Sequence, residues 1–207
     1  MDLLEAAIVR AKREDDPYVE GVHTVEEKLD EGLDLSFYEF HNVEFERCVL
    51  SGVVFTKASF YDCTFEGCDL SNAVFNEAYF SRCRLVGCKL EGTQLNKAFL
   101  RLTKLVECVC RYANMGEATL ESVLLSGCDM REAFFNEVRL RKRTRLEECD
   151  LRRADLFRTS LKGIDLSTCN IAGIMVSDTR AELQGACIAA EQAVDLVGLL
   201  GVRVVDV

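Results

Sequence analysis

The chain has 207 residues and a formal net charge of −10; 49% of its residues are hydrophobic and 29% are charged. This composition excludes a disordered chain. The absence of both an eighteen-residue apolar run and a charged-then-apolar leader favours a cytoplasmic protein without membrane contact. The segment 1–70 holds 17 acidic and 6 basic side chains, whereas the rest is nearly balanced. This asymmetry disfavours direct nucleic-acid binding and is compatible with a basic partner surface or simply with solubility.

The segment 1–32 is predicted to form a helical cap. Residues 2–14, DLLEAAIVRAKRE, have the pattern of a short helix, and Asp2 and Glu5 are spaced as a capping box. A second short helix is predicted from Thr24 in TVEEKLDEG to Gly32. Such a cap would cover strand edges that otherwise invite aggregation.

A five-residue repeat dominates the chain from residue 33 to residue 176. A large apolar residue recurs at every fifth position from Leu35 to Leu140, and the series resumes at Leu146 after one extra residue and fades at Val176. Over these 29 positions, most are Leu or Phe, and a small residue usually stands two places before each. Residues two apart in a strand point to the same face, so the small and the large residue can both point inward. The residue between them then points outward, and the other two residues of each five turn a corner.

The cysteines indicate how many sides each coil has. Seven of them recur at every twentieth position, with one added position across the extra residue: Cys48, Cys68, Cys88, Cys108, Cys128, Cys149 and Cys169. They form one structural column if every coil has four five-residue sides. The whole chain has eleven cysteines, an odd number, and small apolar residues occupy the equivalent positions on the other sides of the coil. We therefore expect reduced thiols packed in a core.

This repeat resembles that of the pentapeptide-repeat proteins. The resemblance implies an all-β solenoid, a right-handed quadrilateral β-helix, with about seven coils over residues 33–176 and short helical caps at both ends. Parallel coils at the interstrand spacing of ~4.8 Å would form a rod roughly 34 Å long. In such a solenoid each coil is held mainly by its neighbours.

The one-residue insertion coincides with the basic run RKRTR at residues 141–145. Charged residues tolerate an irregular exposed backbone, so the run is explained either as a solvated bulge or as a contact patch for an acidic surface. The candidate basic patch comprises Arg141, Lys142, Arg143 and Arg145, extended by Arg139, Arg152 and Arg153.

Residues 177–207 are predicted to form a C-terminal cap. IAAEQAVDLVGLLG indicates a helix closed by Gly201, followed by a strand-like VRVV, and its apolar residues cover more than one side of the helix. A single rod end cannot bury both sides, which predicts a two-fold homodimer. The segment from Leu183 to Val202 also resembles the tail of Qnr-type pentapeptide proteins, which implies tail-to-tail pairing through Gln192, Val194, Leu196, Val197, Leu199, Leu200 and Val202.

Two groups of outward residues are candidate contact surfaces. Tyr79 and Phe99 occupy the same outward position one coil apart, so we expect them to be neighbours in solvent, as scattered surface rings or as part of a partner surface. The candidate acidic partner surface consists of Glu39, Glu44, Glu46, Asp62, Glu66 and Asp69.

We expect no catalytic, cofactor or metal site. The two histidines, His23 and His41, belong to no catalytic or metal-binding motif, and a ladder of parallel thiols does not converge on a point as metal ligands must. The Qnr resemblance implies a non-enzymatic DNA mimic that binds type II topoisomerases (DNA gyrase or topoisomerase IV) and confers fluoroquinolone resistance in several members. The alternatives are an interaction scaffold with an unrelated partner and an immunity factor against a gyrase-poisoning peptide.

Overall fold

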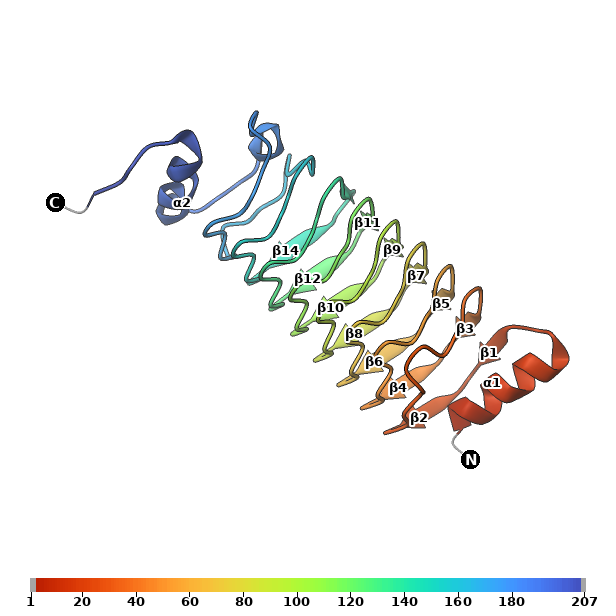
Figure 1. The fold of residues 1–207 in the computed structure, drawn as a ribbon. Helices are drawn as coiled ribbons and strands as arrows, with labels where there is room; N and C mark the ends of the chain where they lie inside the picture. The colour runs from red at the N-terminus through yellow and green to blue at the C-terminus, as the bar shows by residue number, and fades with distance from the viewer. Residues whose placement is uncertain (1–2, 206–207) are drawn as a thin grey trace.

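The computed structural model describes residues 3–205. It shows a straight rod of stacked coils with a helix across the N-terminal end and short helical turns at the other end (Figure 1). Within residues 3–205, no helix combines the length and the apolar character needed to cross a membrane.

Two parallel seven-stranded sheets form adjacent faces of the rod. Sheet A contains, in spatial order, β1 (Tyr18–Glu20), β3 (Glu39–His41), β5 (Ser59–Tyr61), β7 (Tyr79–Ser81), β9 (Phe99–Arg101), β11 (Thr119–Glu121) and β13 (Arg139–Arg141). Sheet B contains β2 (His23–Val25), β4 (Glu44–Glu46), β6 (Thr64–Glu66), β8 (Arg84–Val86), β10 (Lys104–Val106), β12 (Leu124–Ser126) and β14 (Arg145–Glu147).

Isolated parallel bridges mark the other two faces. The third face runs along bridged residues such as Val49, Asp69 and Lys89, and the fourth along residues such as Val54 and Val74. In most coils the partner of a residue stands at the twentieth position after it, as Phe80 does for Phe60. Across the insertion it stands at the twenty-first, as Leu146 does for Leu125. The predicted quadrilateral β-helix, with its column of cysteines in register, is therefore confirmed.

The corners depend on one residue per five in the left-handed backbone region. This residue has a φ between 51° and 67° at most corners from Phe37 to Gly127, and it is glycine at some of them and polar or charged at most others. Because side chains other than glycine resist this region, each corner without glycine stores a modest strain that the packing of neighbouring coils must offset.

The centre of the first coils is a stack of phenylalanine rings. Phe40, Phe60 and Phe80 are buried, and their ring centroids follow at 4.9 and 4.8 Å in nearly parallel planes. Phe55 and Phe75 stack in the same way at 4.9 Å. Such contacts add to the burial of the rings themselves, so the core of one coil is completed only by the next.

The buried cysteines are held by hydrogen bonds as well as by their small volume. The thiol of Cys68 donates to the carbonyl oxygen of Phe45 at 3.2 Å, and that of Cys88 donates to Phe65 at 3.4 Å. Thr93 and Thr144 make the equivalent hydroxyl bonds, to Leu70 at 2.8 Å and to Leu120 at 2.9 Å. Cysteine therefore supplies a small side chain that also satisfies a main-chain acceptor between coils.

The N-terminal cap begins as predicted, but the second predicted helix is wrong. Helix α1 (Leu3–Glu14) lies over β1 and β2, whereas the residues from Thr24 belong to strand β2 and not to a helix. The repeat therefore begins at β1, before the expected boundary at residue 33. Thr24 occupies a position where later coils have Phe or Leu, and its partner is Phe45.

The carboxylate of Glu27 caps helix α1 from outside the helix. It accepts hydrogen bonds from the backbone N–H groups of Leu4, at 3.1 Å, and Glu5, at 3.4 Å, and Glu27 is buried. A negative charge at a helix N-terminus satisfies free donors and favours the helix dipole. Asp2, which was expected to form a capping box with Glu5, lies outside the described residues.

The C-terminal end is made of a turn-rich coil and short helical pieces. These are η1 (Ala181–Leu183), η2 (Ala190–Gln192), α2 (Ala193–Val197) and η3 (Gly198–Leu200). The last three follow without a break and end at Gly201, which has a φ of 72°, as the predicted helix stop requires. Residues 202–205 are exposed and form no strand, so the strand-like expectation for VRVV is wrong.

Truncation of one central ring tests the stacked core. We expect Phe75→Ala to lower the free energy of unfolding by about 3–5 kcal/mol, because it removes a fully buried ring and leaves a cavity. The matched control is Phe37→Ala at an exposed corner, which should cost less than about 1 kcal/mol. Urea unfolding followed by circular dichroism measures both, and equal losses would contradict the stacked core.

Alkaline pH tests the buried thiols. A hydrogen bond with Cys128, together with burial, raises the pKa of Cys149 to about 12, whereas an unfolded cysteine ionises near about 8.5. Above the lower value the unfolded chain loses a proton that the folded chain keeps, so the free energy of unfolding falls as pH rises.

We therefore expect Cys149→Ala to reduce the loss of stability between pH 7.5 and pH 10 by about 2 kcal/mol relative to the unchanged protein. The matched control is Cys187→Ala, which removes an exposed thiol and should leave that loss unchanged. An identical pH dependence of unfolding in Cys149→Ala and the unchanged protein would refute the assignment.

Candidate interaction surfaces

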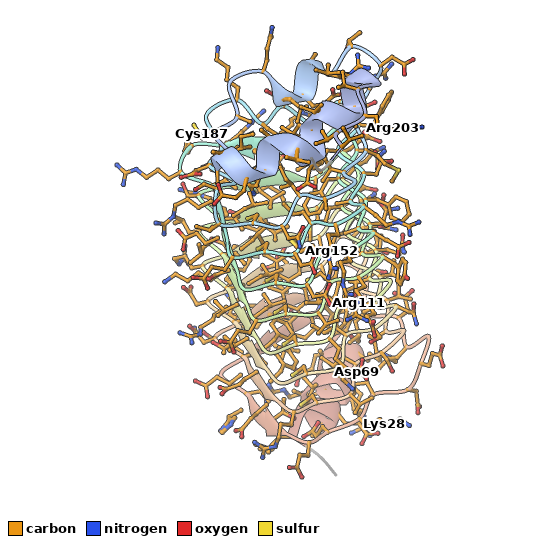
Figure 2. The ribbon with its side chains drawn as sticks, turned by 90° about the vertical axis from the view of Figure 1, so that its left-hand side faces the viewer. Lys28, Asp69, Arg111, Arg152, Cys187 and Arg203 are labelled. Carbon is orange, nitrogen blue, oxygen red and sulfur yellow. The ribbon has the colours of Figure 1, made fainter. Side chains whose placement is uncertain are left out.

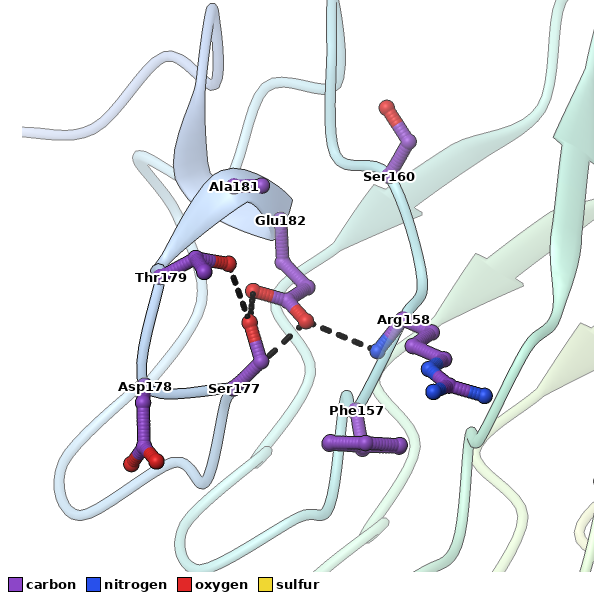
Figure 3. A pocket seen from close by; sticks show the side chains of 8 residues that line it. All are labelled: Phe157, Arg158, Ser160, Ser177, Asp178, Thr179, Ala181 and Glu182. Atoms are coloured by element: carbon purple, nitrogen blue, oxygen red, sulfur yellow. Dashed lines mark hydrogen bonds between the residues drawn. The ribbon is translucent and has the colours of Figure 1, made fainter.

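A surface pocket surrounds a carboxylate that closes the last coil. It has a volume of about 590 Å³ and is lined by residues around Glu182, including Phe157, Arg158 and Ser177 (Figure 3). Glu182 is buried and accepts hydrogen bonds from the backbone N–H of Arg158 at 2.8 Å and from the hydroxyl of Ser177 at 2.9 Å. Burial opposes ionisation, but these backbone and hydroxyl donors hold the pKa of Glu182 below its ordinary value. Its oxygens are thus engaged in holding the fold.

The six predicted acidic residues lie on three sides of the rod. Glu44, Glu46 and Glu66 flank the buried rings of sheet B, Glu39 lies on sheet A, Asp62 turns the corner between the sheets, and Asp69 lies on the third face. The structure therefore gathers them in adjacent coils but not on a single face.

Some of this negative charge is neutralised within the chain. Arg82 forms a bidentate pair with Asp62, with both N–O distances at 2.6 Å, and hydrogen bonding to Arg47 lowers the pKa of Glu46. Arg82 likewise lowers the pKa of Asp62. Among residues 3–205, Glu44, Glu66 and Asp69 have no basic group within ion-pair distance, and Asp69 accepts a bond from the backbone N–H of Ser71 at 3.0 Å. Glu44 and Glu66 are therefore the freest members of the predicted acidic surface.

An aromatic ladder runs along the outer face of sheet A, through directly paired residues at two steps and through diagonal neighbours at the other two. We define it as Tyr18, His41, Tyr61, Tyr79 and Phe99, whose successive ring centroids are 4.9, 4.5, 5.5 and 5.6 Å apart. Its rings are exposed or half-buried on the outer face of the sheet. The expected contact between Tyr79 and Phe99 is confirmed, with ring planes 18° apart. The other three rings were not predicted as members. The ladder uses both the first and the last residue of the three-residue strands, whereas the sequence pattern followed a single outward position.

The basic run at residues 141–145 forms an exposed three-residue corner between β13 and β14. Arg141, Lys142, Arg143 and Arg145 are all exposed, while Thr144 is buried and takes the place of a small core residue. Lys142 pairs with Glu121 at 2.6 Å, and Arg145 pairs with Glu147 at 3.3 Å. Within the described chain, Arg141 and Arg143 have no such partner. The run is therefore only partly neutralised.

A column of arginines on the third face was not predicted as a unit. Arg111 and Arg131 both bond the carboxylate of Asp129, at 2.7 and 2.8 Å, and Arg152 bonds Asp150 at 2.9 Å. Hydrogen bonding from Arg131 and Arg111 holds the pKa of Asp129 well below its usual range. Figure 2 shows Lys28, Asp69, Arg111 and Arg152 one above another along the rod. Arg111 thus bonds a carboxylate of the next coil, whereas Arg131 and Arg152 bond carboxylates of their own coils.

The predicted dimer residues are exposed or half-buried, except for Gln192. Val194, Leu200 and Val202 are exposed by 55%, 63% and 54%, and Leu196, Val197 and Leu199 are half-buried. Gln192 is instead buried: its amide donates to the carbonyl oxygen of Leu166 at 2.9 Å and it accepts a bond from the backbone of Ala189 at 2.7 Å. Its side chain therefore faces its own last coil and cannot contribute to a partner interface.

The thiols form no converging group in the described chain. Ten cysteines are buried and free and Cys187 is exposed and free, and no cluster of three or more histidine, cysteine or acidic residues among residues 3–205 could hold a metal ion.

Comparisons with known proteins agree on the repeat. A family model described as "Pentapeptide repeat region" matches residues 38–82 and 78–156, and one described as "Pentapeptide repeats (8 copies)" matches residues 142–171. No curated protein matches the chain.

Two solved structures illustrate the structural likeness. Full-length QnrB1, a plasmid-mediated fluoroquinolone resistance protein, is 18% identical over 89% of this chain and 100% of its own, with a TM-score of 0.44. HetL, a pentapeptide repeat protein involved in heterocyst differentiation regulation in the cyanobacterium Nostoc, is 16% identical over 87% of this chain and 90% of its own, with a TM-score of 0.32. At these values the likeness carries no argument about function.

Proposed function

The chain belongs to the pentapeptide-repeat family, and from that premise we propose that it is a non-enzymatic DNA mimic that binds a type II topoisomerase, either DNA gyrase or topoisomerase IV. The proposal rests on the charge and shape of the first coils and on the Qnr-like tail of the sequence. A cytoplasmic location is part of the proposal and is in keeping with eleven free thiols.

The linear charge density of the first coils carries the proposal. Residues 18–70 contain twelve acidic and three basic residues, a net charge of −9. At twenty residues and ~4.8 Å per coil, this stretch is roughly 13 Å long, or about one net negative charge per 1.4 Å. Duplex DNA carries one charge per ~1.7 Å, so a surface that binds DNA through its phosphates would meet a comparable charge here.

The arrangement of these charges also supports mimicry. Carboxylates project from sheet A, sheet B, the corner between them and the third face, so negative charge covers several sides of the rod, as phosphates do on a duplex. The later coils are nearly neutral, with 18 acidic and 19 basic residues after residue 70. The mimicry we propose is therefore limited to the first coils, with the rest of the rod acting as a spacer.

We propose that two chains pair through their C-terminal ends. The exposed side chains of Val194, Leu200 and Val202 would be covered by the same residues of a second chain, with Leu196, Val197 and Leu199 beside them. Gln192 is left out of this interface because it is bonded within its own chain. The acidic coils would then lie at the two far ends of the dimer.

Binding is better supported than drug protection. The repeat between Leu35 and Leu140 has no inserted loop, whereas the Qnr resemblance implies projecting loops that matter for protecting gyrase. We therefore propose inhibition or modulation of the topoisomerase as the primary effect and fluoroquinolone protection as a secondary one. An interaction scaffold for an unrelated partner and an immunity factor against a gyrase-poisoning peptide are the alternatives.

A supercoiling assay tests the topoisomerase proposal. We expect the purified protein to reduce DNA supercoiling by gyrase, and we expect Glu44→Lys with Glu66→Lys to weaken this effect at least about tenfold through loss of charge complementarity. The matched control, Glu107→Lys with Glu147→Lys, makes the same charge change in the nearly neutral part of the rod and should retain the effect.

The effect should also decrease as ionic strength rises. Unchanged gyrase and topoisomerase IV activity over a wide concentration range, with and without drug, would favour the unrelated scaffold. Rescue from a gyrase-poisoning peptide, without rescue from fluoroquinolones, would favour the immunity factor.

Sedimentation tests the dimer independently. We expect the unchanged protein to sediment at twice the chain mass of 23.2 kDa at micromolar concentration, and Leu200→Asp to shift it to the monomer by placing a charge in the apolar interface. The matched control is Leu3→Asp, which alters an exposed leucine at the opposite end of the rod. A monomeric unchanged protein, or dissociation by both substitutions alike, would contradict tail-to-tail pairing.

A further inference from the structure

Sheet A stops at β13 although the coil continues beyond it. Within the described residues, no backbone hydrogen bond joins residues 139–142 to residues 159–163 of the next coil. Instead, the backbone N–H of Val138 donates to the side-chain oxygen of Thr159 at 2.8 Å. The two coils are therefore separated on this face, and β13 presents an unpaired edge.

The separation opens a cleft beside β13. It has a volume of about 500 Å³ and lies between β13 and the segment from Arg158 to Lys162. Leu140 lines this cleft and is half-buried, whereas the corresponding residues of earlier strands, such as Leu100 and Leu120, are buried. An apolar side chain is thus accessible at the middle of the free strand.

The cleft is strongly basic. Its wall carries four cationic side chains, Arg139, Arg141, Arg158 and Lys162, and one carboxylate, Glu137. Arg158 pairs with Glu137 at 3.1 Å. In the described chain, the other three cations have no carboxylate within ion-pair distance. We call this cleft the basic crevice.

We propose that the basic crevice binds an extended acidic segment of a partner protein, which adds to sheet A as a strand beside β13. Side chains alternate along a strand, so Arg139 and Arg141 point outward and Leu140 points inward. A segment that alternates carboxylate and branched apolar residues would place acids beside the two arginines and an apolar residue beside Leu140. Its backbone would pair with the free edge, as in known cases of strand addition.

The combination of groups favours a peptide over a simple anion. A phosphate ion would use the cations but neither the free strand edge nor the apolar side chain of Leu140. The rival explanation is that the cations only protect the edge against pairing with other chains, since positive charge on an edge strand discourages aggregation. The two explanations differ in whether a complementary acidic strand binds.

Fluorescence anisotropy tests the proposal with a labelled, acetylated hexapeptide that alternates Glu and Val. We expect saturable binding to the full-length protein that weakens as salt is added. Arg139→Glu with Arg141→Glu should weaken binding by about tenfold or more, because both carboxylate contacts become repulsive. The matched control, Arg143→Glu, changes a cation in the same run that does not line the crevice and should stay within about twofold.

Two further probes separate strand addition from charge alone. A peptide N-methylated at alternate amides keeps its charge but cannot pair as a strand, so one of the two alternately methylated peptides should lose binding by about tenfold or more. The Gln-for-Glu peptide should also lose binding. Circular dichroism checks that each variant is folded.

Each contrary result overturns the proposal. Equal binding of both methylated peptides, equal weakening by Arg143→Glu, or complete displacement by 10 mM inorganic phosphate would indicate a site for anions only. No binding of the hexapeptide to the unchanged protein at millimolar concentration would leave edge protection as the role of the cations.

Discussion

Packing of each coil against the next is the interaction on which the rest of the molecule depends. A single coil buries its large residues only when another coil lies above and below it, as the parallel rings of Phe40, Phe60 and Phe80 show. The two ends therefore need substitutes for the missing neighbour. Helix α1, held by Glu27, supplies one, and the C-terminal turns, held by Glu182 and Gln192, supply the other. At the C-terminal end, Glu182 and Gln192 satisfy backbone groups of the preceding coils, whereas at the N-terminal end Glu27 fixes helix α1 by accepting from its first N–H groups.

The repeat could be predicted from the sequence wherever one large residue recurs at a constant interval, and there the core and its thiol column were predicted correctly. The prediction failed at the start of the chain. Val19 and Thr24 occupy core positions, but their partners Phe40 and Phe45 stand at the twenty-first position instead of the twentieth, and Thr24 is polar. A one-residue shift near Gly32 and a charged, helix-like composition thus concealed the first coil. The same shift after Leu140 was recognised because Leu and Cys continue on both sides of it.

The surfaces were harder to predict than the core, because they depend on how neighbouring coils are placed. Tyr79 and Phe99 share one column and were paired from spacing alone. Tyr61 joins them only through a diagonal contact, which no fixed interval reveals. The basic crevice depends on the loss of strand pairing after β13, where the large residues continue but the backbone changes from strands to turns. Glu27 was placed in an expected helix and Gln192 in the dimer interface, since a buried role for a polar side chain has no signature in a repeat.

The corner with one additional residue has a consequence for how such rods can evolve. Lys142 and Arg143 extend the backbone outward while Thr144 returns to the core, so the following coils remain aligned with the earlier ones. The strands therefore remain paired although the interval between partner residues changes from 20 to 21 residues at this corner. Gain or loss of whole four-sided turns by unequal recombination would change the reach of the protein in steps of ~4.8 Å, while single insertions would be absorbed at corners. Overall length would then be a trait that selection adjusts separately from the caps at the two ends.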